Sequence, residues 1–239
     1  MNKALDILLL NNSEFTTDDF VRAFKDSFSH VSRATIYAEL KKLCDNNIIT
    51  RKRKGIYSVE SAKTYDYSLS EDADKLAKLI KKEYPLVNFQ IWELYQLNEF
   101  VNHQISHNTI FVEVEDILDE TIFILLHKKY RNVLFNPTID EYYRYMGDTT
   151  IVVQKLISEA PQTIDDMRLA SLEKILVDLF SRGLVSKMIE RAEYRDIYEY
   201  AFAKYNINEA KMFRYARRRG VADRIRKYIN EETDIHLEG

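Results

Sequence analysis

Residues 32–59 read SRATIYAELKKLCDNNIITRKRKGIYSV, and they decide how the N-terminal part of the chain folds. Their first half predicts a helix that begins after Ser32, a good N-cap, and that buries an apolar stripe at helical spacing, formed by Ile36, Leu40 and Leu43. Their second half predicts two strands joined by a basic turn, because the consecutive cations Arg51 to Lys54 precede a glycine between apolar segments. The stretch therefore predicts a helix followed by a β-hairpin.

Two further short helices are expected upstream, at residues 3–12 and 17–28. The first places leucines on one face, and Thr16 is a suitable N-cap for the second. The apolar face of the second helix is a repeat of phenylalanines four residues apart, Phe20, Phe24 and Phe28. Three helices and a hairpin within residues 1–64 predict a winged helix-turn-helix domain.

The outward face of the third helix suits contact with DNA. Ala34 and Ala38 point away from the apolar stripe, which lets the helix lie close to the floor of a groove. Neighbouring side chains can reach base edges for specificity, and the hairpin cations can follow the phosphate backbone for affinity. The expected DNA-binding residues are Ser32, Arg33, Thr35, Tyr37, Lys41 and Lys42 on the helix and Arg51, Lys52, Arg53 and Lys54 on the hairpin. The alternative for residues 51–54 is a solvated charge run or a localisation-like signal.

Charge is distributed unevenly along the chain, whose net formal charge is −3. Residues 1–64 carry eleven Lys or Arg and eight Asp or Glu, a net of +3, whereas residues 86–160 carry five and eleven, a net of −6. Residues 65–85 carry a net of −1 and residues 161–239 a net of +1. A basic segment beside an acidic one indicates a polyanion-binding module joined to a part with a different role.

Residues 65–85 are interpreted as a linker and one helix, which Ser70 caps and which ends before Pro85. Beyond them, β-rich segments alternate with helical segments at 95–107 and 116–130, which predicts a sheet. The expected strands are residues 87–92, 109–114, 132–135 and 149–154.

From Leu169 to Ile229 the pattern is almost continuously helical, with breaks at Gly183 and Gly220. The expected fold is therefore a two-domain α/β (α+β) chain. Its N-terminal winged helix-turn-helix is followed, over residues 86–239, by a mixed-sheet domain with a helical C-terminal part.

Two parts of the chain resemble known families. The helix that follows Ser32 and the Lys-Gly-Ile-Tyr hairpin at residues 54–57 look like the winged helix-turn-helix of bacterial transcription regulators. Behind them, residues 168–179, RLASLEKILVDL, follow a strand and a short polar turn. The winged helix together with this helix resembles the AbiEi family, the antitoxins of abortive-infection (type IV) toxin–antitoxin systems.

The AbiEi resemblance implies a DNA-binding transcriptional regulator and not an enzyme. In that family the winged domain binds inverted repeats and represses its own operon, and the C-terminal domain counters a nucleotidyltransferase-type toxin encoded alongside. The resemblance thus implies two partners, an operator in double-stranded DNA and a toxin. No cofactor is expected. A ligand-responsive repressor stays open as an alternative.

Two pairs of side chains suggest metal chemistry. His103 and His107 are one helical turn apart, but a zincin needs Glu where Gln104 stands, because the general base must accept a proton from metal-bound water. Glu113 and Glu115 would share one face of a strand and could hold a divalent cation. We expect ordinary histidines and exposed strand-face carboxylates, or an acidic partner surface, and therefore no metal site.

The enzyme alternative is a metal-dependent nuclease or nucleotidyltransferase with a DNA-binding N-terminal domain. It would use Glu113 and Lys155, but Val153 stands where a nuclease needs an acid, and the chain lacks a Gly-Ser pair to seat a triphosphate. A nucleophile elbow, a phosphate loop and a dinucleotide fingerprint are also missing from the sequence, and Cys44 lies beside the buried stripe of the third helix. No catalytic residue is therefore expected.

A second group of cations lies near the C-terminus and spreads around a helix, so several members must face solvent. The members expected to form an auxiliary nucleic-acid or partner surface are Arg214, Arg217, Arg218 and Arg219. The alternative is a solvated helix that pairs with nearby acids.

The single cysteine excludes an internal disulfide and a cysteine-based zinc site, which fits a reducing compartment. No uncharged apolar segment approaches the length needed to span a bilayer. We expect a cytoplasmic protein without a membrane partner.

Overall fold

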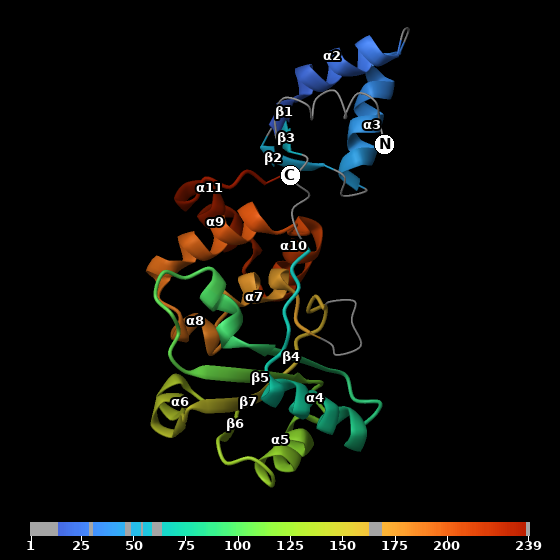
Figure 1. Ribbon diagram of the computed structural model, residues 1–239. Coiled ribbons are helices and arrows are strands. Elements are labelled where there is room, and N and C mark those ends of the chain that lie inside the picture. Colours follow the sequence, from blue (N-terminus) through green and yellow to red (C-terminus); the bar gives the residue numbers. More distant parts are fainter. Residues whose placement is uncertain are drawn as a thin grey trace. The chain divides into compact units, whose positions relative to one another are not determined.

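The computed structural model describes residues 14–28, 31–45, 49–53, 55–58, 64–162 and 169–237 (Figure 1). The backbone divides into two compact units, one formed mainly by residues before Tyr65 and the other mainly by residues from Tyr65 onward. Within the described residues, the first unit contains a three-stranded sheet and the second a four-stranded sheet. The fold is thus mixed α/β with a helical C-terminal part, as the sequence predicts.

The first unit combines two helices with an antiparallel sheet. Its described elements are β1 (Glu14–Thr16), α2 (Thr17–Ser27), α3 (Arg33–Asp45), β2 (Thr50–Arg53) and β3 (Ile56–Ser58). The strands lie in the order β1-β3-β2, so β1 extends the hairpin formed by β2 and β3. The helix expected at residues 3–12 lies outside the described residues.

A capping box fixes the start of α2. Thr16 Oγ1 accepts the backbone N–H of Asp19 at 3.1 Å, and the Asp19 carboxylate accepts the backbone N–H of Thr16 at 2.9 Å. Thr17 donates its backbone N–H to the carbonyl of Gly55 at 2.8 Å, which ties α2 to the hairpin turn. Gly55 has a φ of +77°, a left-handed conformation that glycine adopts without steric cost.

Aromatic rings and the apolar stripe of α3 form the core of the first unit. Phe15 stacks on Phe20 and on Tyr57, with ring centroids 5.9 and 5.8 Å apart. The stripe of α3 is buried as expected, with Ile36, Leu40 and Leu43 all inaccessible to solvent or nearly so. The predicted end of α2 is wrong by one residue, because Phe28 is its C-cap with extended backbone and is 41% exposed.

The second unit is built on a mixed sheet. Its strands are β4 (Phe89–Glu93), β5 (Asn108–Val114), β6 (Val133–Phe135) and β7 (Thr149–Lys155), which confirms the four expected strands. They lie in the order β4-β5-β7-β6, with β4 antiparallel to β5 and the other neighbours parallel. The helices that precede or connect these strands are α4 (Glu71–Glu83), η1 (Leu94–Glu99), α5 (Asp119–His127) and α6 (Ile139–Tyr145).

The chain after β7 is mostly helical, as expected. Its described helices are α7 (Leu172–Leu179), α8 (Val185–Met188), η2 (Arg191–Glu193), α9 (Tyr194–Lys204), α10 (Glu209–Arg218) and α11 (Ala222–Glu232). Gly183 lies between α7 and α8, and Gly220, with a φ of +68°, separates α10 from α11. No helix within the described ranges is long and apolar enough to cross a bilayer.

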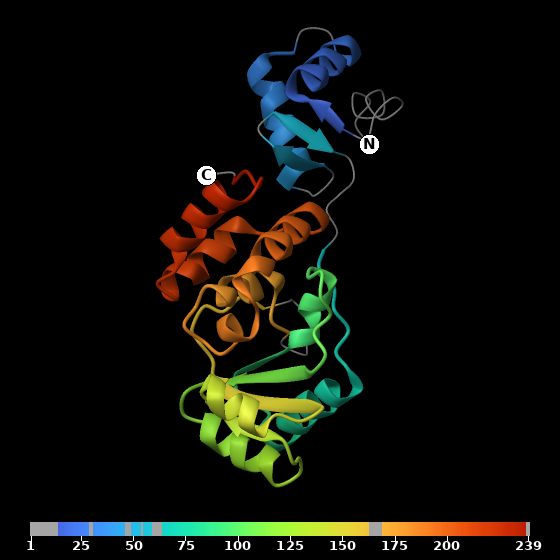
Figure 2. The same ribbon diagram turned by 90° about the vertical axis from the view of Figure 1, so that its left-hand side faces the viewer.

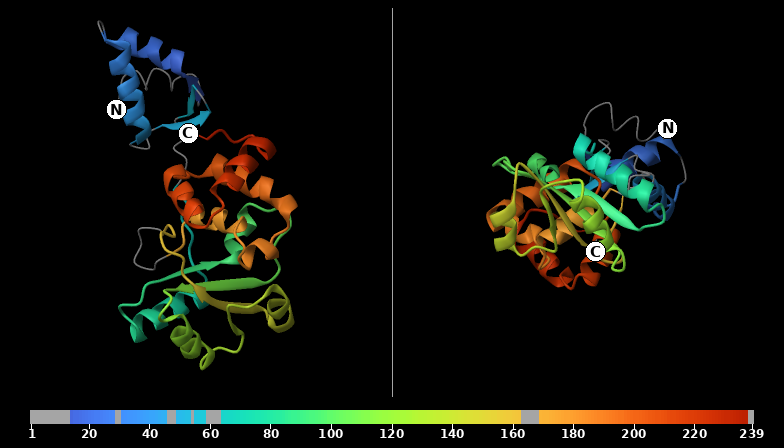
Figure 3. Two further views of the ribbon diagram at one scale, coloured as in Figure 1. Left: turned by 180° about the vertical axis from the view of Figure 1, so that it is seen from behind. Right: turned by 90° about the horizontal axis from the view of Figure 1, so that it is seen from below.

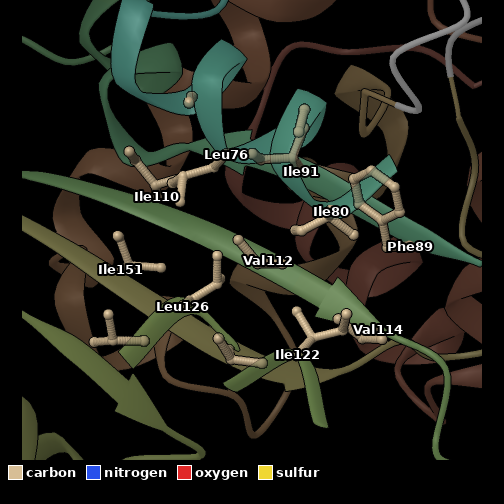
Figure 4. Close-up of a cluster of buried hydrophobic side chains, with 14 of the residues drawn as sticks. Leu76, Ile80, Phe89, Ile91, Ile110, Val112, Val114, Ile122, Leu126 and Ile151 are labelled. Carbon is tan, nitrogen blue, oxygen red and sulfur yellow. The ribbon is translucent and has the colours of Figure 1, made fainter. Parts of the chain in front are cut away.

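The two faces of this sheet meet different helices. On β5, Ile110, Val112 and Val114 point to the face covered by α4 and α5, where they pack in an apolar cluster (Figure 4). The alternate residues Phe111 and Glu113 point to the opposite face, on which the C-terminal helices lie (Figures 1 and 2). Figure 3 shows the same layers from behind.

The helix α4 belongs to the core of this unit. Ser70 caps it as expected, by accepting the backbone N–H of Ala73 at 3.2 Å. Its apolar stripe, Ala73, Leu76, Ala77 and Ile80, is buried in the cluster on the sheet. The segment assigned to a linker and helix therefore packs its helix against the sheet.

Two connections differ from the expectation. The helix expected over residues 95–107 is reduced to η1, and residues 101–107 are not helical; there the side chain of Asn98 accepts the backbone N–H of Ile105 at 2.7 Å. The short helix α6 was not expected from apolar spacing. Its signal in the sequence is the capping box that Thr138 and Glu141 form.

Candidate functional site

The outward face of α3 is solvent-exposed over its described length. Ala34 and Ala38 are exposed on the side opposite the buried stripe, and Tyr37 keeps 49% of its surface accessible. The expected contact residues Arg33, Thr35, Lys41 and Lys42 are exposed as well. The outward face therefore combines small side chains with Lys41 and Lys42, and Arg33 is exposed in the first turn, nearer the buried stripe. None of the three cations is used in the core.

The start of α3 is organised by two hydroxyls. Ser32 Oγ accepts the backbone N–H of Thr35 at 3.2 Å, and the two hydroxyl oxygens lie 2.9 Å apart. Ser32 is therefore the N-cap that the sequence predicts, and the Thr35 hydroxyl is engaged with it. Arg33 projects from the first turn, where the backbone N–H groups at a helix N-terminus also favour an anion.

The hairpin presents part of the expected basic surface. Arg51 is exposed on β2, and the pairing of β2 with β3 shifts register between Arg51 and Arg53. The structure describes the backbone of Lys52 and Arg53, which lie in β2, but not their side chains. Lys54 lies outside the described residues. Of the four hairpin cations, Arg51 is thus the one whose exposed side chain the structure describes.

The C-terminal cations separate into two groups. Arg214, Arg217 and Arg218 are exposed on α10, and Arg218 Nε donates to Ser158 Oγ at 2.6 Å. Arg219 differs, because its side chain is only 18% exposed and its Nε lies 3.2 Å from Asp178 Oδ1. Three of the four expected residues therefore form an exposed basic surface on α10, and the fourth turns into the protein.

A buried ionic cluster lies between the sheet and α7, and the sequence did not predict it. Glu113 Oε1 accepts three hydrogen bonds: from Lys174 Nζ, from Trp92 Nε1 at 2.9 Å and from Gln154 Nε2 at 3.1 Å. Lys174 is fully buried, and its Nζ also lies 2.9 Å from Asp178 Oδ2, one turn along α7. The expectation that Glu113 is an exposed carboxylate is therefore wrong.

The second carboxylate of this cluster is satisfied from α10. Tyr215 donates its hydroxyl to Asp178 Oδ1 at 3.1 Å, and Arg219 Nε approaches the same oxygen within ion-pair distance but without hydrogen-bond geometry. Two carboxylates thus face two cations, so the formal charge of the cluster is zero. Buried charges are tolerated in proteins when they are paired and hydrogen-bonded in this way.

Burial raises the pKa of the Tyr215 hydroxyl far above its ordinary value of 10.0, and the negative charges of Asp178 and Glu113 raise this pKa further. Below about pH 10 the Tyr215 hydroxyl is protonated in both the folded and the unfolded chain, so its protonation does not make stability depend on pH there. Above that pH only the unfolded chain loses the proton, and stability falls as pH rises, by about 1.4 kcal/mol per pH unit for each such phenol.

We expect Tyr215→Phe to make the alkaline loss of stability shallower. Urea unfolding at several pH values between about 8 and 11 measures this slope. The matched control is Tyr143→Phe, because Tyr143 is 57% exposed. If stability fell as steeply with pH in Tyr215→Phe as in the wild type, Tyr215 would not be the source of the alkaline loss.

The residues of the two metal hypotheses are not brought together. His103 is 91% exposed at its side chain and lies 3.1 Å from Glu193, and His107 is an exposed residue of the same non-helical stretch. Glu115 follows the end of β5 and accepts the backbone N–H of Asn88, while Lys155 pairs with Asp116 at the surface. Among the described residues, no three His, Cys, Asp or Glu side chains are grouped so that they could hold a metal ion.

The chain matches the model of a protein family. Residues 35–235 match the model of a family described as "Family of unknown function (DUF6577)", which is most of the 239-residue chain. The chain belongs to this family. No curated protein matches the chain. The part shared with the family begins inside α3, so it includes Lys41, Lys42 and the buried ionic cluster but not Arg33.

Proposed function

We propose that the protein is a DNA-binding transcriptional regulator and that α3 is the helix that enters the major groove. The observation that carries this proposal is the outward face of α3, where Lys41 and Lys42 flank two exposed alanines, while Arg33 is exposed in the first turn of the same helix. The major groove of B-DNA admits a helix, and small side chains allow close approach to its floor. Cations beside the two alanines can reach phosphates or guanine edges.

The fold of the first unit supports this orientation of α3. The helix is held through its opposite face by Ile36, Leu40 and Leu43, so its outward face is not needed for the core. The β2–β3 hairpin carries Arg51 and three further cations, and such a hairpin can follow the phosphate backbone as a wing. The proposed domain is therefore a winged helix-turn-helix that reads DNA with a helix and holds it with a hairpin.

The proposal includes a biological role. By its resemblance to the AbiEi family, the protein would be a cytoplasmic antitoxin that binds inverted repeats, represses its own operon and counters a nucleotidyltransferase-type toxin. The exposed arginines of α10, Arg214, Arg217 and Arg218, are the surface proposed for auxiliary contact with nucleic acid or with that partner. Opposite charge would draw either an acidic protein or DNA to this surface.

The direct test measures DNA binding by the full-length protein. Fluorescence anisotropy would compare a duplex from the upstream region of its own gene with a scrambled duplex at two salt concentrations. We expect tighter binding to the upstream duplex and a strong decrease in affinity with salt, because contacts to phosphates release counterions. Equal, salt-independent binding to both duplexes would contradict the proposal.

A further inference from the structure

A pocket opens in the second unit at the carboxyl ends of two parallel strands. It has a volume of about 270 Å³ and lies among Asn136, which follows β6, Gln154 near the end of β7, and the segment from Arg182 to Lys187. In open α/β sheets, ligands bind in the crevice outside the carboxyl ends of the strands. The location alone makes this pocket a candidate for a small ligand.

The charged residues that line the pocket are all cations. Arg182 and Lys187 both line the pocket and are exposed, and neither forms an ion pair with another residue in the part of the chain that the structure describes. None of the lining residues is an acid. The two cations therefore give the lining a positive formal charge, which suits an anion.

The backbone at the pocket is held in an uncommon conformation. Asn136 has a φ of +44°, which lies near the left-handed region that residues other than glycine seldom adopt. Its N–H donates to the carbonyl of Val153 at 2.9 Å, so it continues the pairing of β6 with β7 before the chain turns. Such conformations cluster at ligand sites, where the surrounding structure maintains them.

The opposite side of the pocket is also fixed. Ser181 Oγ accepts the backbone N–H of Gly183 at 3.1 Å and donates to the Asp178 carbonyl at 2.8 Å, which sets the course of the loop that carries Arg182. Gln154 is held by its hydrogen bond to Glu113. The loop backbone and Gln154 are therefore held in place without a ligand, which lowers the cost of ordering this part of the pocket on binding.

We propose that this pocket binds the phosphate group of a small phosphate monoester, with Arg182 and Lys187 as its cationic partners. A phosphate carries up to two negative charges near neutral pH and offers three strong acceptor oxygens, which suits a guanidinium and an ammonium group. Asn136 lines the same pocket, and its side-chain amide can donate a further hydrogen bond. A volume of about 270 Å³ is close to the lower end of small-molecule pockets, roughly 300–1,000 Å³, so the ester is small. This proposal does not depend on DNA binding.

Isothermal titration calorimetry of the full-length protein with ribose 5-phosphate, inorganic phosphate and ribose tests the proposal. We expect ribose 5-phosphate to bind, inorganic phosphate to bind more weakly, and ribose not to bind. The variant Arg182→Gln/Lys187→Gln should weaken the binding of ribose 5-phosphate at least about tenfold, because it removes two charge-assisted contacts.

The matched control is Lys128→Gln/Arg131→Gln, which removes the same charge from exposed residues that do not line the pocket. Its affinity should stay within about twofold of the wild type, since surface charges at a distance are screened by salt. The proposal is overturned if ribose binds as well as its phosphate, if ribose 5-phosphate gives no binding, or if both double variants bind it equally. A stronger binding of inorganic phosphate than of the ester would also overturn the assignment to an ester.

Discussion

Lys174→Met is expected to lower the free energy of unfolding of the second unit by about 3–5 kcal/mol, which is the usual cost of removing one partner from a buried ion pair. Lys174 is fully buried between the carboxylates of Glu113 and Asp178, and methionine fills a similar volume without the charge. The variant would leave Arg219 as the remaining cation beside two buried carboxylates.

Urea unfolding can be followed at the site itself. Trp92 is the only tryptophan of the chain, and its Nε1 donates to Glu113, so its fluorescence reports on the cluster. The matched control is Lys155→Met, because the pair of Lys155 and Asp116 is about half exposed or more on both sides. Exposed pairs contribute at most about 1 kcal/mol, so the control should unfold nearly as the wild type does. Equal losses in the two variants would refute a structural role for the buried lysine.

The double variant Glu113→Gln/Lys174→Met measures how much of the stability comes from the interaction between these two residues. Removing both charges of an ion pair leaves less uncompensated charge than removing one, so the two losses should not add. We expect the double variant to lose about 0.5–3 kcal/mol less unfolding free energy than the losses of the two single variants added together. Additive losses would show that Glu113 and Lys174 are not energetically coupled.

Local patterns account for most of the fold. The strands β5 and β7 are apolar runs that lie in the centre of the sheet, and the N-caps Thr16 and Ser70 mark where α2 and α4 begin. Two features could not be predicted correctly from local patterns. The strand β1 has three residues, too few to show alternation, and residues 101–107 form a loop although their apolar spacing fits a helix.

The exposed face of α3 and the buried ionic cluster differ in how strongly local sequence patterns predict them. The exposed face of α3 follows from helical periodicity, because the buried stripe defines the opposite side. The buried cluster depends on residues far apart in the chain: Glu113 and Lys174 are 61 positions apart and meet only when α7 packs on the sheet. The one local signal is the i, i+4 spacing of Lys174 and Asp178, which is equally common on exposed helices.

Replacing the cations of α3 should have the largest effect on DNA binding. The variant Arg33→Gln/Lys41→Gln/Lys42→Gln removes three exposed charges from α3 and leaves its buried stripe unchanged. We expect affinity for the upstream duplex to fall about a hundredfold, since each such contact contributes about 1 kcal/mol or more. The slope of log affinity against log salt should decrease by about one for each phosphate contact that is lost.

The control for this variant removes the same charge elsewhere. Lys128→Gln/Lys129→Gln/Arg131→Gln neutralises three exposed cations near the end of α5 and should keep both the affinity and the salt slope. Arg33→Gln alone should also reduce the preference for the upstream duplex over the scrambled one, because an arginine in the first turn of a groove helix can contact a base edge. If the α3 variant and its control lost affinity equally, DNA binding would depend on net charge and α3 would not be the reading helix.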